Sequence, residues 1–140
     1  MASQHPSPPQ MYTPAQISAF LKHIGLPQRF FPAPSSVSPS LDLPVPSLPL
    51  LYALHTHMIS TLPYENLAIH YSATHRNSLD PQFLFDKTIL RGRGRGGFCM
   101  ENALLYYHML RGLGFDVYTV GARTRERDAG MVPSGDFPGW

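Results

Sequence analysis

The single cysteine of this chain, Cys99, lies where a glycine-rich loop runs into an apolar segment, in the stretch RGRGRGGFCMENALLYYHML (residues 91–110). In the first turn of a helix, unsatisfied backbone N–H groups and the positive end of the helix dipole favour a thiolate over a thiol, and the arginines of the loop add positive charge. Because Gly96 and Gly97 have no Cβ, a substrate carbonyl could approach the sulfur closely. The pattern therefore predicts a nucleophilic cysteine.

Two other interpretations of this stretch are open. Free cysteines are often small apolar residues of a core, without any chemical role. Arginine-glycine steps also occur in disordered segments that contact RNA. Such segments act as long flexible tracts, however, whereas this one is short and continues into an apolar helix, which argues against the RNA hypothesis.

The composition sets limits on the classes of function. With 140 residues, of which 43% are hydrophobic, the chain can build a core of its own. A formal charge of +2, with only 14% charged residues, gives little electrostatic attraction to nucleic acid or to a membrane. The N-terminus lacks the apolar region of a signal peptide, and no apolar run approaches the roughly 18 residues of a membrane span. We therefore expect a cytoplasmic protein without nucleic-acid or membrane partners; its oligomeric state is left open.

Proline, glycine and polar residues divide the chain into three parts. Residues 1–12 are polar and proline-bearing and predict a flexible tail. A helical domain is expected over 13–114, interrupted at 26–49 by an insert in which prolines are too dense for a helix or a central strand. Residues 115–140 begin with the alternating segment FDVYTVGAR (115–123), typical of a strand, and continue into loop residues. The predicted fold class is α+β, with 115–140 as the first strand and loop of an incomplete β domain.

Caps and apolar spacing predict the first two helices. The first has Thr13 as its N-cap and ends at Gly25, and the second begins at Ser47 and ends before Pro63. The residues expected to face the core are Ile17, Phe20, Leu21 and Ile24 in the first helix and Leu51, Leu54, Met58 and Leu62 in the second.

Two further helices are predicted around the cysteine loop. After the second helix, PYENLAIHYS (63–72) predicts a turn that enters a short extended segment. Asp80 then caps a third helix over PQFLFDKTIL (81–90). The fourth helix runs from about Cys99 to Leu113 and is apolar almost all round. The third helix is expected to direct Phe83, Leu84 and Ile89 inward, and the fourth to keep only Glu101, His108 and Arg111 in a narrow polar strip.

Three segments resemble one enzyme family. RGGFCMEN (95–102) resembles the active-site signature of the arylamine N-acetyltransferases, in which two glycines after an arginine precede the catalytic cysteine. LPYENL (62–67) is similar to the family's proline-aromatic-glutamate-asparagine-leucine segment, and ISAFLKHIGLP (17–27) resembles its opening helix. The long proline-rich insert and the ending (121–140) are most similar to the fungal branch. The chain is thus identified as a member of this family that corresponds to its N-terminal part only.

This resemblance implies a two-step acyl transfer. Cys99 would accept an acyl group from acetyl-coenzyme A, or another acyl-coenzyme A, as a thioester and pass it to the nitrogen of an arylamine, arylhydroxylamine or hydrazine. No permanently bound cofactor and no metal are implied. The implied fold is a papain-like (cysteine-proteinase-like) helical domain plus the start of a β-barrel, truncated before the barrel and the α/β lid.

The resemblance also implies supporting roles around the cysteine. Glu65 matches a glutamate that lies near the active-site arginine, so we expect a buried charge pair with Arg95 that braces the loop; an ordinary surface pair is the alternative. Phe98 could line an arylamine pocket, although simple packing is the alternative. The positions that match the signature in a supporting role are Arg95, Gly96, Gly97, Glu101 and Asn102.

The partners of a catalytic triad are missing from the sequence. Only one histidine, His108, follows Cys99, and nine residues of helix place it roughly 13 Å away, beyond hydrogen-bond reach. An orienting aspartate among those that follow the cysteine would have no histidine to orient. The family's catalytic histidine comes soon after a segment that resembles GDFPGW, where this chain stops, so we expect an inactive, truncated chain. The alternatives are a catalytically dead fragment with a binding role, a different papain-like thiol enzyme, or an RNA-associated module.

No metal site is expected from the closely spaced histidines. His55 and His57 are two residues apart on a predicted helix, so their side chains face different directions and cannot share an ion.

Overall fold

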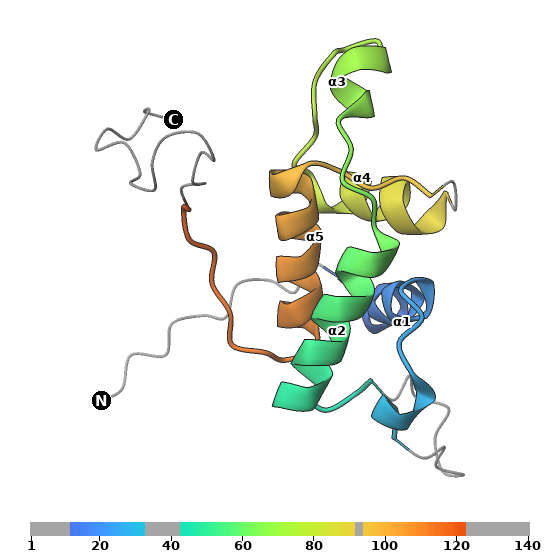
Figure 1. The fold of residues 1–140 in the computed structure, drawn as a ribbon, viewed down its shortest axis with the longest axis vertical. Helices are drawn as coiled ribbons and strands as arrows, with labels where there is room; N and C mark the ends of the chain where they lie inside the picture. Colours follow the sequence, from blue (N-terminus) through green and yellow to red (C-terminus); the bar gives the residue numbers. More distant parts are fainter. Residues whose placement is uncertain (1–11, 33–42, 92–93, 123–140) are drawn as a thin grey trace, which may run out of the picture.

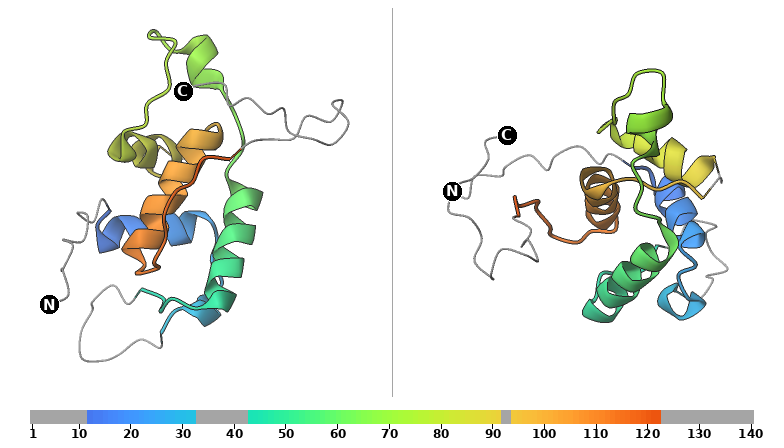
Figure 2. Two further views of the ribbon diagram at one scale, coloured as in Figure 1. Left: turned by 90° about the vertical axis from the view of Figure 1, so that its left-hand side faces the viewer. Right: turned by 45° about the horizontal axis from the view of Figure 1, so that its top comes forward.

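The computed structural model describes residues 12–32, 43–91 and 94–122, and these ranges form a small helical bundle (Figure 1). In chain order its elements are α1 (Pro14–His23), the short 3₁₀ turn η1 (Gln28–Phe30), α2 (Leu48–Thr61), α3 (Leu67–Tyr71), α4 (Pro81–Phe85), the π-helical turn η2 (Asp86–Leu90) and α5 (Cys99–Gly112). In Figure 1, α2 and α5 run alongside each other, α1 and α4 pack beside them, and α3 projects from one end. The views in Figure 2 show the same projection of α3 away from the bundle.

The first helix forms as its caps predict. The Thr13 side chain accepts a hydrogen bond from the Gln16 backbone N–H (3.3 Å), and the Gln16 side chain accepts one from the Thr13 N–H (2.9 Å), which completes a capping box. Pro14 occupies the first turn, and Gly25 ends the helix region with φ +67°, a conformation that glycine adopts without strain. The predicted bounds of this helix are confirmed.

The core lies where α1, α2, α4 and α5 meet. Its buried members include Ile17, Phe20, Leu21, Ile24, Leu50, Leu54, Met58, Leu62, Phe85, Ile89, Leu105, Met109, Leu110 and Leu113. The predicted stripe of α1 is confirmed at all four positions. In α2, Leu50 takes the core position that was predicted for Leu51, which is half-buried. Glycine permits the close approach of α1 and α5, since a Cβ on Gly112 would lie only 2.5 Å from the Ile17 Cδ1.

The third predicted helix changes type half-way along. After five residues of α4 the hydrogen bonding widens to a π turn, which the Arg91 N–H closes by donating to the Asp86 carbonyl (3.1 Å). The inward direction of Phe83 was wrong, because its side chain is 40% exposed and Phe85 is buried instead. Leu84 and Ile89 are buried, as predicted.

The segment after α2 is helical where an extended segment was predicted. Leu67–Tyr71 forms α3, and the Ser72 N–H closes its last turn by donating to the Ala68 carbonyl. Four of its five residues, Leu67, Ile69, His70 and Tyr71, are exposed, so there was no buried stripe from which a helix could be predicted.

The predicted strand at 115–123 does not form in the described residues. Residues 115–122 are irregular, and the only β pairing in the described ranges is a single parallel bridge between Tyr64 and Gly97. Phe115 and Val117 pack on the core in alternation with exposed neighbours, which explains the strand-like pattern, but a strand needs a partner to complete its ladder. The helical half of the α+β prediction is therefore seen, whereas no strand is present at 115–122 and the β part of the fold stays a prediction.

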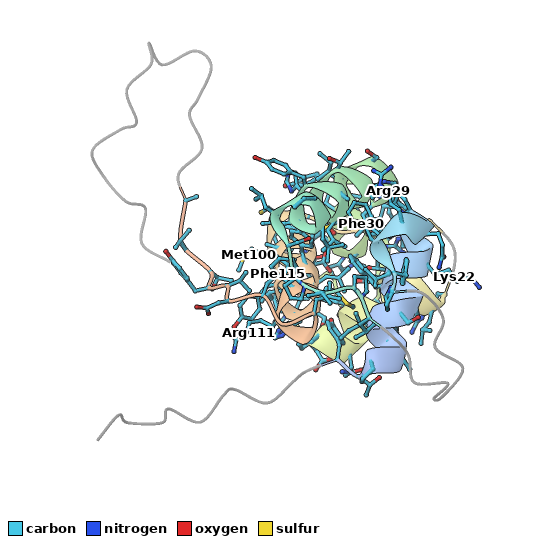
Figure 3. All side chains as sticks on the ribbon, turned by 90° about the horizontal axis from the view of Figure 1, so that it is seen from below. Lys22, Arg29, Phe30, Met100, Arg111 and Phe115 are labelled. Atoms are coloured by element: carbon cyan, nitrogen blue, oxygen red, sulfur yellow. The ribbon has the colours of Figure 1, made fainter. Side chains whose placement is uncertain are left out.

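The ends of the chain fall mainly outside the description. Residues 1–11, 33–42 and 123–140 are not described, so most of the predicted tail, of the proline-rich insert and of the final loop lies outside the described residues. Tyr12 was assigned to the tail, yet it is buried and its hydroxyl donates to the Pro81 carbonyl (2.6 Å). Burial raises the pKa of this phenol well above its ordinary range, and the charge of Asp80 adds to the effect. The insert contains η1, where the Arg29 guanidinium lies over the Phe30 ring (Figure 3).

No helix among the described residues has the length and apolarity that a membrane crossing requires.

A hydrophobic dye such as ANS is expected to bind the native chain strongly. Many large apolar side chains are exposed, including Tyr52 and Ile59 on α2 and Tyr71 on α3, and each forgoes about 1.5–3 kcal/mol of burial. We expect dye fluorescence above that of a well-covered globular protein of equal size, together with concentration-dependent association in size-exclusion chromatography. A monodisperse monomer with a sharp thermal transition and little dye binding would contradict this prediction.

Candidate active site

The loop before Cys99 is held against the segment that follows α2. The Gly97 N–H donates to the Pro63 carbonyl (3.3 Å), and the Glu65 N–H donates to the Gly97 carbonyl (3.1 Å). These two bonds form the parallel bridge between Tyr64 and Gly97. Two of the three sequence segments that suggested the family, LPYENL (62–67) and RGGFCMEN (95–102), therefore meet in space.

The two glycines of the loop are required by packing. A Cβ on Gly96 would overlap the carbonyl oxygen of Pro63, and one on Gly97 would lie 2.7 Å from the Glu101 Cβ. Both glycines are buried. The prediction that they leave room for a substrate carbonyl is not tested, but the contacts give them a structural reason that the sequence did not reveal.

Cys99 is the first residue of α5 and its side chain is exposed. The Asn102 side-chain amide donates to the Gly97 carbonyl (2.8 Å), and Glu101 Oε2 accepts from the Phe98 N–H (3.2 Å). The second bond is one half of a capping box; Phe98 has no side-chain oxygen for the other half. The helix start is thus tied to the loop on both sides of the cysteine.

Glu101 lies in the interior and not in a polar strip as predicted. Its side chain is only 2% exposed, and its Oε1 accepts from the Lys87 Nζ at 2.8 Å. Lys87 belongs to η2 and its side chain is 6% exposed. A buried carboxylate is stable only with a partner of opposite charge and with hydrogen bonds, and Glu101 has both. The hydrophobicity pattern of α5 could not reveal a partner that lies on another element.

The expected pair between Glu65 and Arg95 is present. The Arg95 Nε donates to Glu65 Oε1 at 2.9 Å, and Glu65 Oε2 accepts from the Leu67 N–H at 2.6 Å. The Arg95 side chain is 35% exposed and the Glu65 side chain 12%, so the pair is partly buried, between the buried pair that was expected and an ordinary surface pair. Since Arg95 is engaged in this pair, it is not a freely extended arginine of the kind that an RNA-binding tract offers.

Four charged groups form one alternating cluster, which we call the charge row: Arg95, Glu65, Lys87 and Glu101. Lys87 connects the two pairs because its Nζ lies 2.8 Å from Glu101 Oε1 and 3.9 Å from Glu65 Oε1. Two cations face two carboxylates, so the row has no net charge when all four groups are ionised. Sequence reasoning missed Lys87; the one available signal was a lysine in the second half of the mainly apolar segment PQFLFDKTIL.

The pKa of Glu65 is lowered by its neighbours. Burial on its own would raise the pKa, but the hydrogen bonds from Arg95 and the Leu67 N–H and the positive charges of Arg95 and Lys87 outweigh it. Because the pKa in the folded chain lies below its ordinary value of 4.5, the ionised form stabilises the fold above that pH. This contribution is lost as the pH falls through the folded pKa.

Glu65→Gln is expected to flatten the acid dependence of stability. From about pH 6 to about pH 3, a range that spans the ordinary carboxyl pKa, the native chain should lose free energy of unfolding more steeply than the variant. Urea unfolding followed by circular dichroism at several pH values measures both curves. Burial lowers the pKa of His108, so this residue also destabilises the folded chain at low pH. It does so in both proteins, and the difference between the two curves removes its contribution. Parallel curves would contradict the prediction.

The family model described as N-acetyltransferase (Acetyltransf_2) matches residues 47–136 of the chain. This range contains α2, the cysteine loop and α5, and it covers more than half of the sequence. The chain belongs to the arylamine N-acetyltransferase family. The resemblance drawn from the cysteine and PYENL segments is confirmed, and membership implies the papain-like fold; a β-barrel stays a prediction.

Curated relatives of this chain include fungal and vertebrate proteins. The chain is 40% identical over 116 residues to the N-malonyltransferase FDB2 of Fusarium pseudograminearum, a match that covers 82% of the chain and 33% of that protein. FDB2 of Gibberella moniliformis is 36% identical over 115 residues, 80% of the chain and 33% of that protein. The arylamine N-acetyltransferase liver isozyme of Gallus gallus is 34% identical over 79 residues, 56% of the chain and 26% of that protein. The chain spans between about a quarter and a third of the length of these curated relatives. No solved structure matches it.

Five of the described histidines contact carbonyl oxygens or aromatic rings. His57 Nδ1 lies 3.1 Å from the Ile24 carbonyl oxygen, and His75 Nδ1 lies 2.9 Å from the Ile69 carbonyl oxygen. The other ring contacts are His55 with Tyr106, His70 with Tyr71, and His108 with Tyr12 and Tyr107. Within residues 12–32, 43–91 and 94–122, no three His, Cys, Asp or Glu side chains are grouped to hold a metal ion.

Proposed function

We propose that the chain is the cysteine-bearing part of an acyltransferase, in which Cys99 accepts an acyl group from an acyl-coenzyme A and passes it to an amine nitrogen. The observation that carries this proposal is an exposed cysteine at the first residue of α5, in a loop that is fixed by hydrogen bonds on both sides, in a chain of the N-acetyltransferase family. The supporting positions are Arg95, Gly96 and Gly97 in the loop.

The reaction divides into two displacements at a carbonyl carbon. In the first, the Cys99 thiolate forms a bond to the carbonyl carbon of the acyl-coenzyme A, and the coenzyme thiolate leaves. In the second, the amine nitrogen forms a bond to the same carbon, the Cys99 sulfur leaves, and the ammonium proton passes to a base. The N–H groups at the start of α5 have no partner within the helix and favour the negative charge of the thiolate.

The charge row holds the loop and the start of α5 in place, and it adds no net charge near the Cys99 sulfur. Glu65 holds the loop through Arg95, and Glu101 holds the peptide before Cys99 through the Phe98 N–H. Phe98 itself is half-buried beside the cysteine. We propose that its ring contributes to the amine pocket at its exposed edge.

The acyl group that the relatives favour is malonyl. The relatives that match about 80% of the chain are named N-malonyltransferases, whereas those named arylamine N-acetyltransferases match about 55%. We therefore propose malonyl-coenzyme A as the preferred donor, with acetyl-coenzyme A as the alternative, and an arylamine as acceptor.

Intact-mass spectrometry of the 140-residue chain incubated with each acyl-coenzyme A tests the proposal. We expect the mass to increase by one acyl group, on the peptide that contains Cys99, with the malonyl adduct forming faster than the acetyl adduct. Hydroxylamine should remove the adduct, as it cleaves thioesters.

Two controls make this result specific to the folded site. Cys99→Ala should show no adduct, and the native chain unfolded in urea should react more slowly than the folded chain at the same pH. Equal rates for the folded and unfolded chain, or an adduct that persists in the variant, would overturn the proposal.

A further inference from the structure

Lys87 is a buried ammonium that the two-step reaction does not use. Its side chain is 6% exposed, in a π turn whose neighbours Thr88 and Ile89 are also buried. Removing a lysine charge from water is unfavourable unless the charge is paired, so its position is explained by the two carboxylates it contacts. The other lysine of the sequence, Lys22, projects from α1 into solvent (Figure 3).

Lys87 is the group through which the two halves of the charge row are connected. Each carboxylate uses one oxygen for cations and the other for a backbone N–H. Glu65 Oε2 accepts from the Leu67 N–H, and Glu101 Oε2 accepts from the Phe98 N–H. Lys87 contacts Oε1 of both carboxylates. It therefore fixes Glu101 relative to the segment that also holds Arg95.

The contact of Glu101 with Phe98 extends this connection to the cysteine. The Phe98 peptide directly precedes Cys99, so its orientation sets the direction in which the first residue of α5 leaves the loop. The Cβ position of a first-turn residue follows from the backbone before it. A displaced Glu101 would also leave the Phe98 N–H without its partner inside a partly buried loop.

We infer that Lys87 is a positioning residue for the nucleophile: it orients Glu101, which in turn holds the Phe98 peptide and thereby Cys99 at the helix N-terminus. This inference rests on the proposed role of Cys99, but it is tested by the reactivity of the thiol and not by acyl transfer. If the alkylation test contradicts this inference, the acyl-adduct experiment can still succeed. If no acyl adduct forms, the alkylation test can still succeed.

The test measures alkylation of Cys99 by iodoacetamide, a neutral probe, in single variants of the 140-residue chain. Cys99 is the only thiol, so the measured rate belongs to one site. For Lys87→Met and Glu101→Gln we expect alkylation at pH 7 to slow by about tenfold. At high pH, where every thiol is ionised, the rates should converge.

The direction of the rate change in the two variants distinguishes a positioning role from a direct effect of charge on the thiol. Lys87 and the Phe98 N–H donate to different oxygens of Glu101, and Glu101→Gln replaces one of these oxygens by an NH2 group that cannot accept, so both variants should be slow. If charge alone controlled the thiol, loss of the cation would slow the reaction and loss of the anion would accelerate it. Opposite signs, or native rates in both folded variants, would overturn the inference.

A matched control and a double variant keep the test independent of stability. Lys22→Met makes the same change at the exposed lysine and should react at the native rate. Lys87→Met with Glu101→Leu removes both buried charges, which should restore stability lost in the single variant because no unpaired charge remains. Its thiol should stay slow; recovery of the native alkylation rate along with the stability would show that Lys87 acts only through folding and would overturn the positioning role.

Discussion

Incubated with an acyl-coenzyme A and an arylamine, the 140-residue chain is expected to become acylated at Cys99 and to release almost no acylated amine. The second displacement requires a base for the ammonium proton, and a positioned base contributes typically about 10²–10⁴-fold to such a step. Five of the described histidines, His55, His57, His70, His75 and His108, contact carbonyl oxygens or aromatic rings, and His108 lies nine residues along the helix from the cysteine, roughly 13 Å away. His5 lies outside the described residues.

Imidazole added to the solution provides the measurement. It should raise the rate of amine release from the acylated chain, because it supplies the missing proton acceptor, while Cys99→Ala should release nothing with or without it. Chromatographic detection of the acylated amine over time follows both reactions. Many turnovers without imidazole, at a rate that imidazole leaves unchanged, would show that a base within the chain serves the thiol and would contradict the prediction.

Local chemistry was sufficient to predict the helices that carry the core. Thr13, Ser47 and Asp80 each accept a hydrogen bond from a backbone N–H three residues on, and these caps are readable from sequence because cap and helix are adjacent. The stripe of α1 was likewise set by spacing within ten residues. The start of α5 at Cys99 followed from the change from glycine to apolar residues.

The features that were missed depend on contacts between distant residues. Glu101 was placed in a polar strip because its burial requires Lys87, which lies 14 residues earlier on another element. The strand at 115–123 was predicted from alternation alone, whereas strand formation depends on a partner that the described residues do not provide. Periodicity reports which face of an element is apolar, but it does not report what charge or strand meets the other face.

In the candidate site, too, some features could be predicted from the sequence and others depend on contacts between distant residues. Sequence similarity pointed to the cysteine, the two glycines and the pair of Glu65 with Arg95, and the structure brings these residues together around the bridge between Tyr64 and Gly97. The reason for the glycines could not be predicted, because Pro63, which excludes a side chain at Gly96, is 33 positions away in the sequence. A glycine-rich loop beside a cysteine can be interpreted as space for substrate or as space for the chain itself, and only the fold distinguishes them.

Gly96→Ala is therefore expected to be strongly destabilising. The new Cβ would overlap the carbonyl oxygen of Pro63, a backbone atom that cannot turn aside as a side chain would. That same oxygen accepts the Gly97 N–H, so any retreat of Pro63 also breaks the bond that holds the loop. We expect the free energy of unfolding to fall by at least about 3 kcal/mol, the upper end of what overpacking of a buried site costs. The thiol of Cys99 should lose its fixed position along with the loop.

Gly112→Ala is the matched control for this variant. Its Cβ would also make a short contact, but the atom it meets is the terminal Cδ1 of Ile17, which can change rotamer. Alanine within a helix gains up to about 1 kcal/mol over glycine, which offsets part of the cost of that contact. Urea unfolding followed by circular dichroism should therefore show a clearly smaller loss of stability for Gly112→Ala than for Gly96→Ala. The two variants add the same methyl group. Equal losses in the free energy of unfolding would therefore mean that the Pro63 carbonyl moves as easily as the Ile17 Cδ1, and that the loop before Cys99 is not fixed by its backbone contacts.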